Sequence, residues 1–354
     1  MLKCVGSIFA RATKSSLISS SLSSSSAAGP GWCNVWCVLL TQTRTYFFES
    51  AKHIIPHPNK KLKGGEDAAF CGYRYLGVAD GVGGWDSVGV DAGQYSKELL
   101  QRVEEALREH GRRSRFTPSP LEILKAAYHK TQAIGSSTCC LVFLDHYSRS
   151  VRTANLGDSG FLLFRPSVHE VVLKSEFQCH DFNFPVQLGT GSSDLPEHAD
   201  VTEAPTQPGD WVLLASDGVW DNLYDDDILR VLERAPNPVL AAEEIAKAAY
   251  NHSLDTKRRS PFTERERSHS MQNNTTGGKP DDISVVAAKV KDPYQMRRED
   301  VPDEVAQLMG LDAKAAQDGQ EQEAKRGFHR ELKKMKKHNR AEEWRAVMRG
   351  EHSS

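Results

Sequence analysis

The sequence predicts a mixed α+β fold in which β-sheets pack together and helices flank them. Short apolar runs, rich in β-branched and aromatic residues, recur through the middle of the chain at lengths that suit strands. Stretches with helical spacing of apolar residues separate groups of these runs. Because strands and helices do not alternate strictly, the order favours packed sheets over a repeated βαβ unit.

Each predicted element has its own local signal. The expected strands are Tyr75–Ala79, Thr138–Leu144, Val151–Asn155, Phe161–Phe164, Trp211–Ala215 and Ile283–Val290. The expected helices are Gln94–His110, Leu121–Gln132 and Pro238–Tyr250. In the first helix the apolar residues from Leu99 to Leu107 fall near the helical period, and Pro238 suits the first turn of the third.

The composition indicates four regions. A leader covers residues 1–46, a core domain covers residues 50–290, a polar surface loop lies within it at residues 251–280, and a charged tail covers residues 291–354. The tail is expected to be partly helical or disordered. The net charge of −2 gives no overall electrostatic reason to expect nucleic-acid binding.

The leader has the composition of a mitochondrial transit peptide. The first 48 residues lack Asp and Glu, carry a serine run from Ser15 to Ser26, and include several basic residues. Arg44-Thr45-Tyr46 resembles a site cut by the matrix processing peptidase. We therefore expect a mitochondrial protein, in the matrix. A secretory signal would need Trp36–Leu40 as its apolar core, which is short and late, and a disordered cytosolic leader is the remaining alternative.

The tail contains a basic segment with a narrow apolar stripe. Between Lys325 and Arg340 there are eight Lys or Arg residues and one acid, and Phe328, Leu332 and Met335 recur at helical spacing. Such a helix predicts contact with an anionic membrane or an acidic partner. A solvated helix without a partner is the alternative.

The most informative feature of the sequence is a set of acidic residues at the ends of apolar runs, each beside glycine or a turn. The segments are Gly65-Glu66-Asp67, Ala79-Asp80-Gly81, Gly157-Asp158-Ser159, Asp217-Gly218-Val219-Trp220-Asp221 and Pro280-Asp281-Asp282. Converging carboxylates repel one another and are costly to desolvate without a cation. Mg²⁺ or Mn²⁺, which prefer oxygen ligands, are the expected cofactors.

In this order the segments resemble the motifs of the type 2C metal-dependent serine/threonine protein phosphatases. The segments that carry the resemblance are GEDAAF, VADGVGGW, GSSTCCLVFL, TANLGDSG, LLASDGVWDNL and GGKPDDISVV, and they span about residues 60–290. The resemblance implies two packed antiparallel sheets in an α-β-β-α sandwich. The phrases ADGVGGW, NLGDSGF, FNFPVQL and GGKPDDI are similar to the mitochondrial subgroup associated with ubiquinone biosynthesis.

The resemblance assigns roles residue by residue. The positions that match metal ligands are Glu66, Asp80, Gly81, Asp158, Asp217, Asp221 and Asp281. Asp80 would bridge two ions, and Asp158 and Asp221 would belong to a weaker third site. Asp67 matches the residue that orients metal-bound water, which would attack the phosphoester directly.

Two catalytic groups remain open. Leu62 stands where the family usually has a phosphate-gripping arginine, so Lys63 or Lys61 is expected to bind phosphate, as a point charge. The family suggests a histidine as the acid that protonates the leaving oxygen, and the sequence does not identify it; His53 and His57 are candidates.

Phosphorylated mitochondrial proteins are the expected substrates, and no nucleic-acid partner is expected. One alternative is a catalytically silent module that keeps the fold and binds phosphoproteins, although every expected acidic position is filled. A two-metal nuclease is another, but the core lacks a marked basic patch. Both alternatives predict no phosphate release from phosphoserine peptides.

Overall fold

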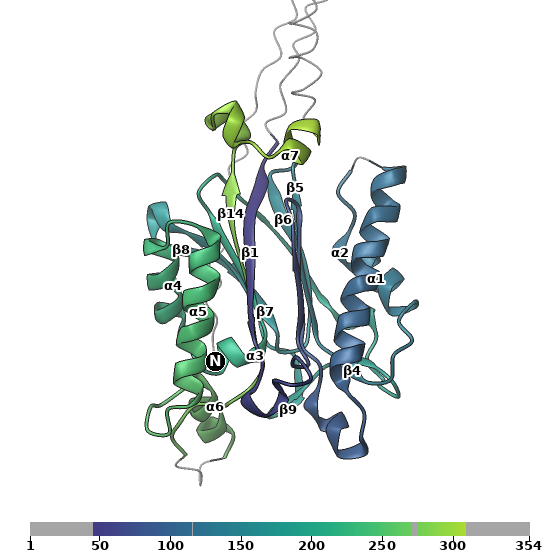
Figure 1. The fold of residues 1–354 in the computed structure, drawn as a ribbon, viewed down its shortest axis with the longest axis vertical. Helices are drawn as coiled ribbons and strands as arrows, with labels where there is room; N and C mark the ends of the chain where they lie inside the picture. Colours follow the sequence, from purple (N-terminus) through teal and green to yellow (C-terminus); the bar gives the residue numbers. More distant parts are fainter. Residues whose placement is uncertain (1–44, 115, 271–274, 309–354) are drawn as a thin grey trace, which may run out of the picture. The chain divides into compact units, whose positions relative to one another are not determined.

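Two antiparallel five-stranded sheets stack face to face in the computed structural model, which describes residues 45–114, 116–270 and 275–308 (Figure 1). Sheet one has the order β1 (Phe47–Ile55), β14 (Ile283–Lys291), β13 (Trp211–Ala215), β7 (Gly160–Arg165) and β8 (Glu170–Lys174). Sheet two has the order β12 (Asp200–Pro205), β6 (Ser150–Leu156), β5 (Cys139–Asp145), β3 (Tyr75–Ala79) and β2 (Ala68–Cys71).

Helices cover the outer face of each sheet. Helices α1 (Ala92–Arg113) and α2 (Pro120–Tyr128) pack on sheet two, and α3 (Asp217–Trp220), α4 (Asp225–Arg234) and α5 (Pro238–Ser253) pack on sheet one (Figure 1). Asp91 and Asn237 cap α1 and α5 by accepting hydrogen bonds from backbone N–H groups of the first turn. The architecture is the expected α-β-β-α sandwich.

Strand β5 shows why the central strands read as continuous apolar runs. Its side chains alternate, so that Leu141 and Phe143 pack beneath the helices while Val142 and Leu144 pack against the opposite sheet. Both faces of the strand are therefore buried, and no position requires a polar side chain.

The shorter elements lie at the edges and ends of the sandwich. Strand β4 (Ser136–Ser137) pairs with β11 (Leu188–Gly189), and β9 (Cys179–Asp181) pairs with β10 (Phe184–Pro185). Single 3-10 turns occupy Pro58–Lys60, Gly83–Val88, Pro166–Val168, Pro196–His198, Pro293–Gln295 and Arg298–Asp300. The remaining helices are α6 (Pro261–His269) and α7 (Asp303–Leu308).

Each of the expected strands and helices is present, with ends that shift by a few residues. The expected polar loop at residues 251–280 is corrected, because it contains α6. Ser260 and Thr263 form a reciprocal capping box, and Pro261 occupies the first turn. These signals start a helix even though its apolar face is weak.

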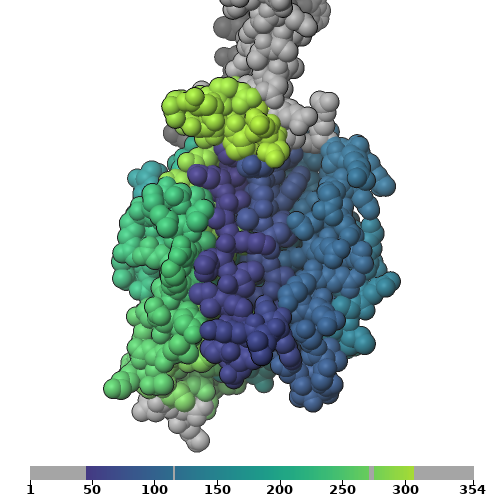
Figure 2. Space-filling model, in the orientation of Figure 1, coloured from purple at the N-terminus to yellow at the C-terminus, as the bar shows by residue number. Residues whose placement is uncertain are grey.

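The packed domain extends beyond both expected limits, 50 and 290. Strand β1 pairs along its whole length with β14, and the preceding Tyr46 is already buried in the core. After β14, Val301 and Val305 pack against Phe47. As an edge strand, β1 runs along the open side of the sandwich between the two helical layers (Figure 2). Its polar residues are partly or fully exposed and follow no strict alternation, so the sequence pattern did not indicate a strand.

The leader and the basic segment at residues 325–340 lie outside the described residues. None of the helices in the described part of the chain has both the length and the apolar character needed to cross a bilayer.

Candidate functional site

Antiparallel pairing brings the first two acidic segments together. Ala68, the first residue of β2, pairs with Ala79, the last residue of β3. Asp67 precedes β2 and Asp80 follows β3, so both lie at the same end of sheet two.

The other acidic segments meet at one end of sheet one for the same reason. Ala215, at the end of β13, pairs with the first residue of β7 and with the third residue of β14. Asp158 therefore lies beside Asp217 and Asp281. The Asp158 loop crosses from β6 in sheet two to β7 in sheet one, so the two groups occupy the same end of the sandwich.

One hydrogen bond, from the backbone before β2 to the Asp282 side chain before β14, joins the two sheets at this end, and others hold the adjacent turns. The Oδ2 atom of Asp282 accepts a hydrogen bond from the Glu66 N–H at 2.9 Å, and its Oδ1 atom accepts one from the His57 N–H at 2.6 Å. The Gly81 N–H donates to the Glu66 carbonyl oxygen at 3.2 Å. A Cβ at Gly81 would lie 2.8 Å from that oxygen and 2.9 Å from the carbonyl oxygen of Ala92, so only glycine fits.

The clustered carboxyl groups shift one another's acidity. Burial raises the pKa of Asp80 well above its ordinary value, and the neighbouring Asp67 and Asp217 raise it further. Burial, with the charge of Asp282, raises the pKa of Asp67 to about 8. Burial, with the charge of Asp217, raises the pKa of Asp281 to about 7. The site therefore favours added positive charge.

Two lysines supply positive charge to this cluster. The Lys279 Nζ atom contacts a carboxylate oxygen of Asp217 and lies 2.8 Å from Asp221 Oδ2 and 3.3 Å from Asp281 Oδ2. Although burial opposes it, Lys279 keeps the pKa of Asp217 below its ordinary value. On the other side of the site, Lys60 forms an ion pair with Glu66.

The donor set fits a hard divalent cation. Both carboxylate oxygens of Asp67 and one of Asp217 are buried and lack a hydrogen-bond partner. Buried carboxylate oxygens without partners are costly unless a cation or water satisfies them. Within the described residues, no group of three or more His, Cys, Asp or Glu side chains is already arranged to bind a metal ion. The ammonium groups of Lys279 and Lys60 lie next to the carboxylates.

A pocket of about 420 Å³ opens over the cluster. Its lining includes Asp80, Asp158, Asp217 and Asp281, together with Lys60 and Lys279. The Gly81 segment and the β10 residues Phe184 and Pro185 complete the wall. The pocket therefore combines hard oxygen donors with two ammonium groups, a combination suited to a phosphate group held by cations.

Comparison with known proteins agrees with this geometry. The family model described as "Stage II sporulation protein E (SpoIIE)" matches residues 72–291. The human "Protein phosphatase PTC7 homolog" is 41% identical over 249 residues, covering 64% of this chain and 79% of that protein. The "Probable protein phosphatase 2C 55" of Arabidopsis thaliana is 38% identical over 243 residues, covering 67% of this chain and 50% of that protein. The chain belongs to the protein phosphatase 2C family.

A solved structure supports the membership. The "X-ray structure of the photosystem II phosphatase PBCP" superposes with a TM-score of 0.64 at 30% identity, covering 69% of this chain and 99% of that one. The chain spans half of the length of the Arabidopsis relative and about four fifths of the human one.

The structure gathers the metal-ligand positions that the family resemblance implies. Asp80, Gly81, Asp158, Asp217 and Asp281 line the pocket described above. Glu66 joins them through Lys60, and Asp221 joins them through Lys279. Their roles as ligands stay predictions.

Lys63, one of the two lysines expected to bind phosphate, is not brought to the cluster. It is exposed and lies 3.3 Å from Asp86, and Lys61 is also exposed. Of Lys60, Lys61 and Lys63 in this phosphatase 2C domain, Lys60 is the one that reaches the pocket. The 3-10 turn at Pro58–Lys60 turns the chain so that Lys60 faces inward while the next residues face solvent.

The histidine candidates do not meet the cluster either. The His57 ring accepts a hydrogen bond from the Asn59 N–H at 3.1 Å, and His53 lies within β1 opposite Val285. The side chain of His57 therefore caps a turn, and its backbone rather than its ring contacts Asp282.

Sequence reasoning gave no role to Lys279, Asp282 or Arg265. Lys279 stands in the GGKPDDI segment, so its closeness to Asp281 in the chain was a usable signal. The contact between Arg265 and Asp221 joins residues 44 positions apart, and no local pattern announces it.

Proposed function

We propose that this chain is a metal-dependent serine/threonine protein phosphatase that hydrolyses phosphoserine and phosphothreonine with Mg²⁺ or Mn²⁺. The observation that carries the proposal is the convergence of the separate acidic segments on one pocket that also holds two lysines. Membership of the protein phosphatase 2C family supports it.

The residues of the site would have separate roles in metal binding and in orienting water. Glu66, Asp80, Gly81, Asp217 and Asp281 would hold two ions, and Asp158 and Asp221 a weaker third. When bound, these ions would lower the pKa of the attacking water and offset the charge of the phosphate. Asp67, whose buried oxygens have no partner, would orient that water by accepting a hydrogen bond from it.

Lys60 would take the place of the usual arginine. Its ammonium group lies in the pocket wall beside Glu66, where it would attract a phosphate oxygen. The lysine ammonium is a point charge, whereas the arginine guanidinium is planar and donates two parallel hydrogen bonds, so binding by lysine depends less on the orientation of the phosphate.

Phosphate release from a phosphothreonine peptide tests the activity. The full chain is assayed with Mn²⁺, with Mg²⁺ and with EDTA, beside the Asp80→Ala variant. We expect turnover with either ion, and loss of at least about a hundredfold in EDTA and in the variant, because Asp80 lies at the centre of the cluster. A folded wild type that never releases phosphate but binds the phosphopeptide would favour the silent binding module.

We further propose that the protein acts in the mitochondrion on phosphorylated mitochondrial proteins. The acid-free, serine-rich composition of residues 1–46 supports this location. Tyr46 is buried in the domain, so processing between Tyr46 and Phe47 would remove a core side chain. Import of the full chain into isolated mitochondria, followed by N-terminal sequencing, tests the location; a product that stays outside would exclude it.

The basic segment at residues 325–340 is proposed to contact anionic lipid or an acidic partner. Its eight Lys or Arg residues against one acid support the proposal. Sedimentation with anionic liposomes, with and without residues 320–354, tests it. Equal pelleting of the two proteins would end the membrane proposal.

A further inference from the structure

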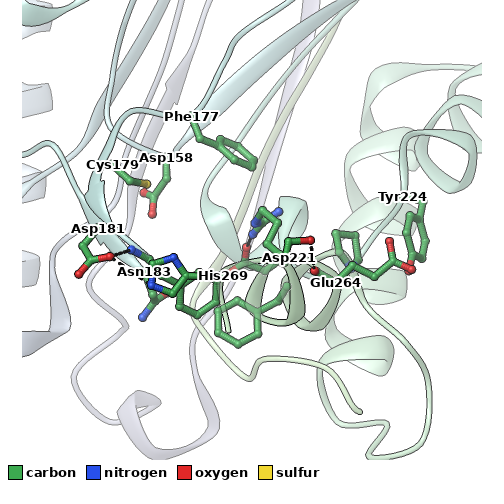
Figure 3. Close-up of a pocket in the computed structure, with 14 residues that line it drawn as sticks. Asp158, Phe177, Cys179, Asp181, Asn183, Asp221, Tyr224, Glu264 and His269 are labelled. Carbon is green, nitrogen blue, oxygen red and sulfur yellow. Dashed lines mark hydrogen bonds and ion pairs between the residues drawn. The ribbon is translucent and has the colours of Figure 1, made fainter. Parts of the chain in front are cut away.

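A second pocket, of about 660 Å³, adjoins the acidic cluster and is not used by the proposed chemistry (Figure 3). Asp158 and Asp221 line it and belong to the cluster as well. Helix α6 forms one wall, and β9 with its turn forms the other. Its volume lies in the range of about 300–1,000 Å³ that is usual for ligand pockets.

Helix α6 is fastened directly to the acidic cluster. The Phe262 N–H donates a hydrogen bond to the Asp221 carbonyl oxygen at 3.1 Å, and the guanidinium of Arg265 forms an ion pair with the Asp221 carboxylate. The Tyr224 hydroxyl donates a hydrogen bond to Glu264 at 2.9 Å. The pocket wall therefore has a set position relative to any group held at the carboxylates.

The opposite wall is joined to α6 by aromatic contacts. The Phe182 ring lies 5.2 Å from the Phe262 ring and 5.5 Å from the His269 ring, centroid to centroid. Asp181 and His269 form an ion pair at 3.5 Å (Figure 3). The two walls thus support each other across the pocket mouth.

The aromatic side chains of the lining favour an apolar occupant over an acidic one. Phe177, Phe182 and Phe262 supply aromatic surface. The two basic side chains of the lining, Arg265 and His269, contact the lining carboxylates of Asp221 and Asp181. An acidic guest would meet these carboxylates without a spare cation from the lining, whereas an apolar guest would bury against the rings.

We propose that this pocket binds the apolar side chain, aromatic or long aliphatic, of a residue flanking the phosphorylated residue of a substrate polypeptide. The proposal rests on the proposed phosphatase function, because the substrate phosphate must lie at the carboxylates for a flanking side chain to reach the pocket. Asp158 and Asn183, which line both pockets, make the two positions continuous.

Peptide kinetics on the full chain with Mn²⁺ tests the proposal. A phosphothreonine peptide of alanines is compared with peptides that carry Phe, Leu or Asp at each of the three positions on either side. We expect the wild type to prefer Phe or Leu over Asp at one position by about tenfold or more in kcat/KM. Phe262→Leu and Phe182→Ala should each reduce that preference to about threefold or less.

A ratio between peptides cancels any common effect of a variant on the chemical step. Phe116→Ala is the matched control, since Phe116 is 69% exposed and outside the pocket, and it should keep the wild-type ratio. A wild type without preference at any position, or a preference that survives both pocket variants, would overturn the proposal.

Two further readouts separate this proposal from the phosphatase activity. Hydrolysis of p-nitrophenyl phosphate, which has no flanking residue, reports the chemistry alone. Fluorescence anisotropy of the labelled Phe and Asp phosphopeptides reports binding alone. Activity on p-nitrophenyl phosphate without a preference among the peptides would contradict only the pocket proposal. Preferential binding of the Phe phosphopeptide without hydrolysis of any substrate would support the pocket proposal and contradict the proposed phosphatase activity.

Discussion

Two lysines, Lys60 and Lys279, supply positive charge to the carboxylates at the end of the sandwich, in addition to Arg265. They differ in burial and in partners: Lys279 is nearly enclosed among three aspartates, while Lys60 stands in the wall of the pocket beside Glu66. We therefore expect different consequences when each is removed.

Removing Lys60 should weaken substrate turnover. Loss of a charge-assisted contact of about 1.5–3 kcal/mol corresponds to roughly 10- to 100-fold. We expect Lys60→Met to lower kcat/KM for a phosphothreonine peptide by that factor and Lys63→Met to leave it within about twofold, because Lys63 lies outside the pocket. Steady-state kinetics with Mn²⁺ decides, and the reverse ranking would assign phosphate binding to Lys63.

Removing Lys279 should destabilise the metal-free protein. Asp217, Asp221 and Asp281 would lose their shared buried counter-charge, a change worth about 3–5 kcal/mol when one partner of a buried pair is removed. We expect Lys279→Met to lower the unfolding free energy in EDTA by that amount. Chemical denaturation in EDTA measures it.

The matched control is Lys174→Met. Lys174 pairs with Asp225 at the surface, so its loss should cost at most about 1 kcal/mol. Added Mn²⁺ should restore more stability to Lys279→Met than to the wild type, since a cation can replace the missing charge. Equal effects of the two lysine variants in EDTA would contradict the expectation.

At the scale of elements, β5 is the strand on which both helical and inter-sheet packing depend. Phe143 is fully buried and packs edge-on against Tyr75, with ring centroids 4.9 Å apart. We expect Phe143→Ala to lower the unfolding free energy by about 3–5 kcal/mol through lost burial and a residual cavity. Denaturant titration measures it, and Phe116→Ala, at an exposed site, should change it by at most about 0.5 kcal/mol. Similar losses in both variants would show that β5 is not central to the core.

For the whole molecule, His146 links folding to pH at the end of β5. Burial, and the charge of Arg74, lower the pKa of His146 to about 4 from an ordinary 6.5. In the unfolded chain the His146 ring therefore binds a proton below pH 6.5, whereas in the folded chain it binds one only at about pH 4. The contribution to stability is complete above pH 6.5 and falls as the pH drops through this window.

The expected loss is about 1–2 kcal/mol, since the ring is partly exposed and solvent screens part of the shift. Unfolding free energies measured between pH 7 and pH 4 should fall less steeply in His146→Gln than in the wild type. Parallel curves for the two proteins would show that His146 does not contribute.

Much of this fold is readable from short-range patterns. A continuous apolar run such as Trp211–Ala215 predicts a buried strand, because both faces of the strand are covered. The apolar residues of α1 recur with the helical period along one face. Sequence patterns of this kind did not predict strand β1 or helix α6. Each is partly exposed, so its polar residues follow no strict period, and pairing or capping decides its conformation.

The sequence by itself determined the mixed α+β class, the apolar strands, and the acidic residues at the strand ends, because each signal lies within a few neighbouring residues. Tertiary structure alone decided that Lys60 rather than Lys63 reaches the pocket, and that Asp282 accepts a hydrogen bond from the Glu66 backbone. These choices depend on contacts such as Lys279 with Asp217, 62 residues apart, and His57 with Asp282, 225 residues apart. Local propensity cannot report such contacts, because the free energy that selects them exists only after the two sheets have packed.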